Sequence, residues 1–209
     1  MRRLCTIAML EYSAETATEL PRAAYEFTMI PMQPKTAQIS GVGQPTVHAK
    51  QAVADSMYSK GLAFLGAAVL TSQLAKKKEN AHGRPDEATE YVLLHLLCQG
   101  LEIVIKGLLL MHDFAKYRPI LKRKFGHNLE KLVAEGVATG IVDAPSPEVV
   151  EELTELNKFF MEHRLRYGDF TDLFFNPLLI EHAYVERWSM GWLNRAAARV
   201  DVWRKTGAL

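Results

Sequence analysis

Apolar residues recur every three or four positions from His48 onward, which is the period of an amphipathic helix. The first such stretch runs to about Glu79, and Gly83 separates it from a second, more apolar stretch that Pro85 can open. The surplus of apolar residues in the second stretch indicates burial on more than one side, so we expect it to be the central helix of the core. The residues predicted to face the core are Val53, Met57, Ala63, Phe64, Ala67, Leu70 and Leu74 in the first helix and Tyr91, Leu94, Leu97, Leu101, Val104, Leu108 and Met111 in the second.

Three further helices are predicted in the second half of the chain. A short one spans about 128–135, a Ser–Pro pair at 146–147 starts a longer one that runs to about Arg166, and an Asn–Pro pair at 176–177 starts the last. No strand or hairpin signal competes, so the predicted fold class is all-α, an up-and-down helical bundle of four long helices and one short helix. The predicted core positions are Val149, Val150, Leu153, Leu156, Phe159, Phe160, Leu179, Ala183, Tyr184, Trp188, Trp192, Ala196, Val200 and Trp203.

Residues 1–48 differ from the rest of the chain, because prolines and glycines interrupt them and no apolar period is sustained. We predict a poorly ordered or loosely packed leader there and a helical bundle over 49–209. The apolar stretch near the N-terminus ends at Glu11, before it reaches the length of a secretion signal. The longest nearly apolar run, Gly61–Leu70, is far shorter than the roughly 20 residues that span a bilayer, so no membrane segment is expected.

The composition argues against several functional classes. The 25 Lys and Arg residues nearly balance the 24 Asp and Glu residues, so the chain as a whole has no field that would hold nucleic acid or an anionic membrane. The two cysteines, Cys5 and Cys98, cannot form a disulfide framework or a four-thiolate zinc site, which suits a reducing cytoplasm. The seven histidines show no metal-binding spacing within a helix, and the standard phosphate-loop and nucleophile motifs are missing. We therefore expect neither a metal nor a cofactor.

Two short motifs carry unexpected polar residues. Glu102 and Lys106 are four residues apart in the most apolar helix, where charges need partners to offset desolvation. The motif Gly126–Leu129 places His127, a residue type that can act as an acid or a base, next to Asn128, a residue suited to cap the short helix. Each motif has a structural interpretation, an ion pair or a helix start, and a functional one, part of a ligand-binding site.

A third motif, His163–Asp169, lies at the predicted end of the helix that starts at 147. Its two arginines could bind phosphate, or they could pair with a carboxylate such as Glu102 and satisfy a helix terminus. We predict ligand-binding roles for Glu102, Lys106, His127, Asn128, Arg164, Arg166 and Tyr167. If the protein is catalytic, its candidate catalytic residues are His127, His163 and Arg166.

In this order, the three motifs resemble those of the HEPN superfamily, the higher eukaryotes and prokaryotes nucleotide-binding domains, over about residues 50–205. Glu102 and Lys106 match a Glu-x-x-x-Lys-like element in an apolar second helix. Gly126–Leu129 matches a Gly-His-Asp/Asn-Leu element, and the dipeptide 166–167 matches a later Arg-Tyr element, with glycine following where the family often has proline. The resemblance implies a homodimer in a setting such as prokaryotic defence or a toxin–antitoxin pair.

The chain departs from the ribonuclease members of that superfamily. Those members carry the pattern Arg-x4–6-His, which places both side chains over a scissile phosphate at a dimer interface. No arginine here has a histidine at that spacing, and Arg123 and His127 are one residue too close. The catalysis of the family therefore cannot be transferred to these positions.

Charges also cluster locally. Five basic residues occur with no acid between Asp113 and Glu130, and Asp143–Glu155 carries five acids and no base. The basic residues, here called the basic patch, are Lys116, Arg118, Lys122, Arg123 and Lys124. Such a patch could meet phosphates, an acidic surface on a partner or a second copy of the chain, or it could be a solvated loop. The aromatic residues of the last helix could belong to the core or to a subunit interface.

Three functions remain open from the sequence. The leading hypothesis is a cytoplasmic, homodimeric HEPN-like domain that binds RNA, a nucleotide or a protein partner and does not contact a membrane. The second is a metal-independent ribonuclease with a non-standard catalytic set. The third is a purely structural protein-interaction module, whose polar residues only stabilise the bundle.

Overall fold

A computed structural model describes residues 46–77, 87–167 and 180–207. These residues belong to one compact unit, which covers 43–209. They form helices and turns, with no strand in any of the three described ranges, and this confirms the all-α prediction. The predicted leader, except for its last residues, and the helix start at 176–177 lie outside the described residues.

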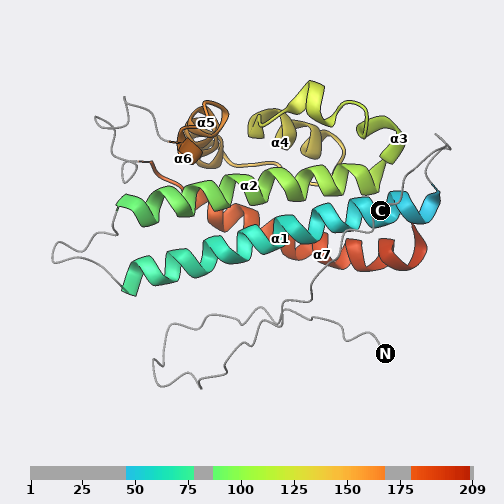
Figure 1. Ribbon diagram of the computed structural model, residues 1–209, viewed down its shortest axis with the longest axis horizontal. Coiled ribbons are helices and arrows are strands. Elements are labelled where there is room, and N and C mark those ends of the chain that lie inside the picture. Colours follow the sequence, from blue (N-terminus) through green and yellow to red (C-terminus); the bar gives the residue numbers. More distant parts are fainter. Residues whose placement is uncertain (1–45, 78–86, 168–179, 208–209) are drawn as a thin grey trace, which may run out of the picture. The chain divides into compact units, whose positions relative to one another are not determined.

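The helices α1 (Val47–Lys77) and α2 (Glu87–His112) lie side by side and run in opposite directions (Figure 1). Glycines let the two backbones approach closely. A Cβ on Gly61 would lie 2.6 Å from the backbone nitrogen of Val104, and a Cβ on Gly100 would lie 2.6 Å from Leu65 Cγ. Both distances are shorter than van der Waals contact, so neither position has room for a side chain.

The buried face of α1 differs from the predicted one. Its buried side chains include Ala54, Tyr58, Leu65 and Ala68, whereas four of the predicted core residues are exposed. The exposed ones are Val53 (48%), Ala63, Leu70 (62%) and Leu74 (56%). The large apolar residues indicated the wrong side because part of the face that meets α2 consists of small residues, Ala54, Gly61 and Ala68, which a periodicity of bulky side chains does not detect. The predicted stripe of α2 is confirmed from Leu94 onward, since Leu94, Leu97, Leu101, Val104, Leu108 and Met111 are all buried, whereas its first residue, Tyr91, is partly buried.

The polypeptide between α2 and α5 is more regular than a connector. It forms α3 (Phe114–Tyr117), a π-helical turn η1 (Leu121–Phe125) and α4 (Leu129–Ala138). Asp113 caps α3 by accepting a hydrogen bond from the backbone of Lys116 at 2.9 Å. The short helix predicted at 128–135 is therefore confirmed and extends three residues further.

The helix α5 (Pro147–Met161) is shorter than predicted. It begins at the Ser146–Pro147 signal but ends at Met161 rather than near Arg166, because His163 adopts a left-handed backbone conformation with φ of 58°. A one-turn helix, α6 (Arg164–Tyr167), follows this break. On α5, Val149 is buried as predicted whereas Val150 is exposed.

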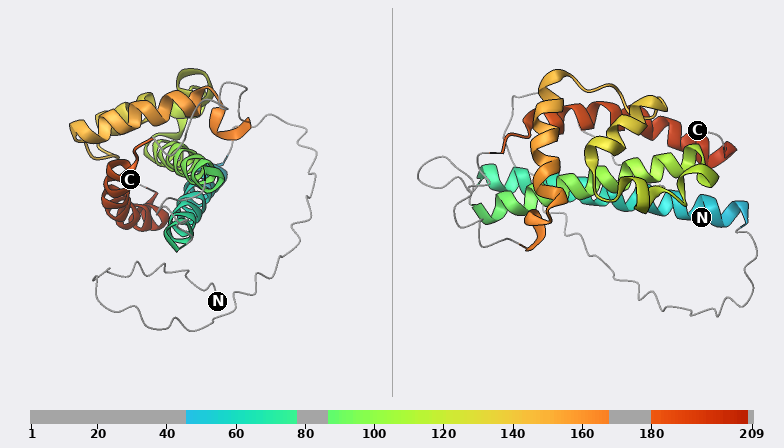
Figure 2. Two further views of the ribbon diagram at one scale, coloured as in Figure 1. Left: turned by 90° about the vertical axis from the view of Figure 1, so that its left-hand side faces the viewer. Right: turned by 90° about the horizontal axis from the view of Figure 1, so that it is seen from above.

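The last helix, α7 (Ala183–Thr206), packs against α2 and α5. Its predicted core residues Trp192, Ala196, Val200 and Trp203 are buried and Trp188 is partly buried, whereas the predictions for Ala183 and Tyr184 at its start are wrong, since both are exposed. Burial of these tryptophans favours the core over the subunit interface. Figure 2 shows α5 lying across α2 and α7, so the up-and-down arrangement of four aligned helices is not confirmed.

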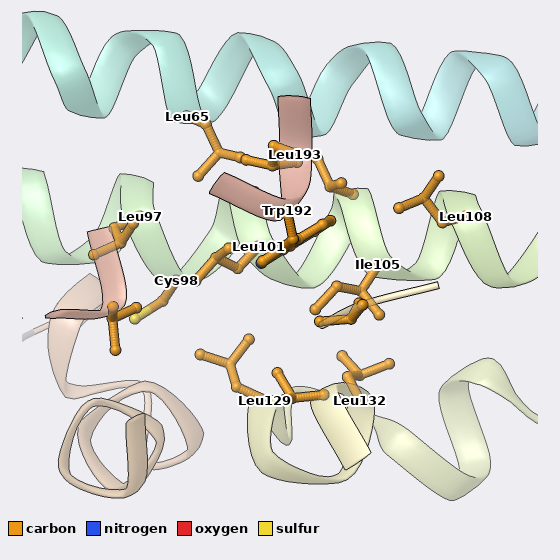
Figure 3. Packing of buried hydrophobic residues seen from close by; sticks show 14 of the residues in the cluster. Leu65, Leu97, Cys98, Leu101, Ile105, Leu108, Leu129, Leu132, Trp192 and Leu193 are labelled. Atoms are coloured by element: carbon orange, nitrogen blue, oxygen red, sulfur yellow. The ribbon is translucent and has the colours of Figure 1, made fainter. Parts of the chain in front are cut away.

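The core is organised around α2. Figure 3 shows Leu101 and Ile105 of α2 pointing toward Leu129 and Leu132 of α4. By length and composition alone α2 could also cross a membrane, which corrects the prediction that no segment is long enough. However, 72% of its most apolar window is buried inside the fold, which is the environment that a core helix of this composition requires.

Candidate functional site

The charged pair of α2 is buried in the protein. Glu102 is 4% exposed and Lys106 is 9% exposed, and Lys106 Nζ lies 2.6 Å from Glu102 Oε1. The same ammonium donates a hydrogen bond to the backbone oxygen of Gly126 at 2.5 Å. A buried ion pair is tolerated only when further hydrogen bonds compensate for the water that both groups lose. Lys106 therefore ties α2 to the residue that precedes His127.

His127 completes this arrangement on the second oxygen of the carboxylate. Its Nδ1 lies 2.9 Å from Glu102 Oε2, although 25 residues separate the two in the chain. The imidazole is 41% exposed, whereas the Glu102 side chain is 5% exposed. A histidine at the surface is thus anchored to a carboxylate in the core, which is the arrangement that orients histidines in many functional sites.

His163 lies beside His127. The two ring centres are 5.2 Å apart with an angle of 77° between the ring planes, and the ring of Phe160 contacts His127 edge to face at 5.8 Å. His163 is exposed and has the positive φ described above, a conformation that costs energy for a residue with a side chain. The structure therefore brings Glu102, Lys106, His127 and His163 together, and we call these four residues the imidazole site.

The arginine motif is only partly described. The guanidinium of Arg164 lies 4.8 Å from the ring centre of Phe159, and its Nη1 is 3.8 Å from Glu162 Oε2. The two oxygens of Glu102 already contact Lys106 and His127, which argues against the predicted pairing of Glu102 with an arginine. Arg166 and Tyr167 lie in α6, but their side chains are outside the described residues, so their predicted roles stay predictions.

Asn128 has a structural role in this region. Its Oδ1 accepts a hydrogen bond from the backbone of Lys131 at 2.9 Å, which confirms it as the cap of α4. A second amide was not foreseen: Asn157 of α5 accepts a hydrogen bond from the backbone of Leu129 at 2.7 Å. Asn157 also donates to Glu130 Oε2 at 2.7 Å. These contacts join α5 to the first residues of α4, which follow His127 in the chain, and no local sequence signal indicates them.

The basic patch divides into two groups. Lys124 and Lys116 lie 2.7 Å and 3.4 Å from the carboxylate of Glu135, which also accepts a hydrogen bond from the Tyr117 hydroxyl at 2.8 Å. The hydrogen bonds from Lys124 and Tyr117 lower the pKa of Glu135 to about 2. The exposed side chains of Arg118, Lys122 and Arg123 have no ion pair among the described residues. Within the basic patch, these three side chains are therefore the cations available to a ligand.

A second histidine cluster was missed by the sequence reasoning. His182, at the start of α7, has its Nδ1 3.5 Å from Glu90 Oε1 and its Nε2 3.3 Å from Glu186 Oε1. Burial acts to lower the pKa of His182, but its contacts with Glu186, with the Ile180 carbonyl and with Glu90 together raise it. Burial raises the pKa of Glu90. The cluster joins α2 to α7, and Glu90 is too far in sequence from His182 and Glu186 for the three to form a motif.

The acids of α5 line a hollow of about 370 Å³ together with Glu181 and Tyr184. One of them, Glu152, is buried and accepts a hydrogen bond from the backbone of Val185 at 2.8 Å, so it caps α7. Within the described ranges, no group of three or more His, Cys, Asp or Glu side chains is arranged to hold a metal ion. The structure therefore offers no metal centre in those ranges to explain the imidazole site.

Comparison with known proteins gives no relative. No protein-family model matches the chain, and neither a curated protein nor a solved structure matches it at a significant level. The resemblance to HEPN domains consequently depends on the three sequence motifs. Of these, the structure places the first two in direct contact and brings the histidine that opens the third beside them.

Proposed function

We propose that the chain is a HEPN-like helical domain that binds RNA at the imidazole site. The observation that carries this proposal is the contact of Glu102 with His127 next to His163, because a residue of α2 and residues of two separate turns converge, with one imidazole partly exposed and the other exposed. Exposed imidazoles donate hydrogen bonds to phosphate oxygens, and protonation strengthens the attraction. The proposal includes the homodimer, the cytoplasmic location and the defence or toxin–antitoxin setting that the resemblance implies.

The available cations support a nucleic acid as the ligand. Arg118, Lys122 and Arg123 lie in and just before η1, which ends two residues before His127. Neutralisation of phosphates by such side chains releases counterions and gives most of the affinity in protein–RNA contacts. A short path of positive charge therefore leads along the chain to the imidazole site.

The test is retention of an end-labelled single-stranded RNA by the purified protein in EDTA. We expect His127→Ala to lose most of the retained RNA without a large change in melting temperature, because the imidazole is partly exposed. His48→Ala is the matched control, since His48 is an exposed histidine in the first turn of α1 and has no role in the imidazole site. Equal retention by the wild type and His127→Ala would contradict the proposal. Absence of any retention would favour a protein partner.

A second candidate, metal-independent RNA cleavage, is favoured by the closeness of the two imidazoles. Transesterification of RNA needs a base that takes the proton of the 2′-hydroxyl, which then attacks phosphorus, and an acid that gives a proton to the departing 5′-oxygen. His127 and His163, with ring centres 5.2 Å apart, could fill these two positions. Cleavage in EDTA that disappears in both His127→Ala and His163→Ala would support this candidate. A substrate with deoxyribose at every position should stay intact.

A further inference from the structure

The carboxylate of Glu102 determines which nitrogen of His127 can carry a hydrogen. In its ion pair with Lys106, the carboxylate offers only hydrogen-bond acceptors. The contact of His127 Nδ1 with Glu102 Oε2 at 2.9 Å therefore requires the hydrogen on Nδ1. In the neutral ring, Nε2 then has the free lone pair, and in the protonated ring it has the second hydrogen.

Lys106 holds the peptide that precedes His127 in place. Its ammonium bonds to the oxygen of Gly126, the residue before His127, and Gly126 itself has a left-handed φ of 53°. One buried pair therefore fixes His127 twice, through the side chain by Glu102 and through the preceding peptide by Lys106. A pair that served stability alone would not need to contact both a partly exposed histidine and the peptide that precedes it.

We propose that Glu102, with its charge balanced by Lys106, is a positioning residue that fixes the Nδ1–H tautomer of His127 and leaves Nε2 to receive a phosphate group beside His163. The ligand chemistry in this inference rests on the proposed function, whereas the tautomer rests on the geometry alone. The recognised chemical group is a phosphate, whether it belongs to RNA or is free.

The tautomer is measured by long-range proton–nitrogen correlation NMR of the histidine rings, at a pH where His127 is neutral. We expect the wild type to show the hydrogen on Nδ1. In Glu102→Gln, the amide can present its own N–H to the ring, so the Nε2–H form should gain population. Glu151→Gln, at an exposed position on α5, is the control and should leave the His127 tautomer unchanged.

A second variant tests the inference in case Glu102→Gln does not fold. Glu102→Gln leaves the buried ammonium without its counter-charge, so Glu102→Gln/Lys106→Met removes both charges and serves if the single variant does not fold. The double variant should show the same change of tautomer. A wild-type ring with the hydrogen on Nε2, or an unchanged tautomer in every folded variant that lacks the Glu102 carboxylate, would overturn the inference.

Titration of the wild type with inorganic phosphate then tests the ligand. We expect the His127 and His163 ring signals to shift, and we expect the affinity to fall about tenfold in Glu102→Gln, by analogy with the loss of a carboxylate behind a metal-binding histidine. The predicted tautomer together with no phosphate-induced shift would refute the proposed function and leave the positioning role of Glu102 standing. A phosphate-induced shift at His127 together with the hydrogen on Nε2 would support the proposed function and refute the positioning role of Glu102.

Discussion

Gly107 of α2 lies directly against the backbone of Tyr58 of α1, so that a Cβ on Gly107 would be 2.7 Å from the Tyr58 nitrogen and 3.0 Å from its Cα. The obstructing atoms belong to the main chain of a long helix, which cannot turn away as a flexible side chain can. The distance between α1 and α2 is therefore set by the absence of a side chain at this position.

Gly107→Ala is expected to destabilise the protein by about 1–3 kcal/mol, the usual cost of overpacking, even though alanine favours helices. Gly66→Ala is the matched control, because a Cβ on Gly66 meets nothing within 4 Å. That variant should gain stability by up to about 1 kcal/mol through helix propensity alone. Urea unfolding of the two variants checks the prediction, which fails if both are stabilised equally.

Asn157→Leu should destabilise the protein by about 1–3 kcal/mol, because the buried backbone N–H of Leu129 then loses its acceptor. Thr154→Ala is the comparison, since Thr154 also contacts Glu130 from α5 but is exposed. Thr154→Ala should lower the free energy of unfolding much less than Asn157→Leu. Chemical denaturation measures both, and similar costs in the two variants would show that the Asn157 bond is unimportant.

The stability of the wild type should fall as the pH drops from about 4.5 to about 2, partly through Glu135. The pKa of its carboxyl is lowered from 4.5 to about 2 by Lys124 and Tyr117, so this carboxyl becomes protonated at a lower pH in the folded state than in the unfolded state. The stabilisation is therefore complete above the pKa of the unfolded state, and it is lost as the pH falls through the pKa of the folded state. Glu135→Gln should remove this part of the acid dependence.

The size of the Glu135 contribution at neutral pH is expected to be about 1 kcal/mol or less, because both lysines are about half exposed and solvent screens the pairs. Unfolding curves of the wild type and Glu135→Gln at several pH values measure it. Parallel curves from pH 7 down to about pH 2 would show that the carboxyl does not contribute.

His163→Gly should raise the stability by about 1 kcal/mol or more while it weakens RNA binding. Glycine adopts a φ of 58° without strain, whereas histidine does not. His163→Ala should lose the ring without relieving the backbone, so it should weaken binding with no gain in stability. Thermal unfolding and RNA retention of both variants separate the two effects, and a loss of stability in His163→Gly would show that the ring holds the turn together.

RNA binding by the proposed site should depend on salt through three cations. Replacing Arg118, Lys122 and Arg123 with glutamine should reduce the slope of log affinity against log salt by about 2, since each contact to a single strand contributes about 0.7. Lys116→Gln/Lys124→Gln should change the slope less, because Glu135 already binds both lysines. Equal changes in the two variants would mean that the Glu135 pairs open on binding.

The sequence predicted those parts of the structure that depend on local periodicity and capping. The apolar stripe of α2 and the cap at Asn128 belong to this class, because neighbouring residues along the chain specify them. The prediction for the buried side of α1 was wrong, since glycine and alanine make part of its contact with α2 and the spacing of large side chains does not reveal them. The break at His163 was missed because a histidine in the left-handed region leaves no pattern in the residues around it.

The candidate site was predicted as three motifs, but not as one contact network. That Glu102 would contact His127 does not follow from the sequence, because the contact depends on how α4 docks against α2. The contacts of Asn157 and His182 are likewise made between helices, so only the folded chain shows them. Charge runs were also misleading in part, as Glu135 binds two of the five basic residues from outside the run.

The close approach of α1 and α2 has a consequence for local opening of the protein. Amide hydrogens in the middle of α2 are shielded by α1 on one side and by α4 and α7 on another, so they should exchange with solvent only when the whole unit unfolds. His127 and His163, by contrast, lie in turns between helices at the surface. We expect the amide hydrogens of these turns to exchange faster than those of α2, so the two imidazoles can adjust to a ligand while the helix that carries Glu102 and Lys106 stays intact.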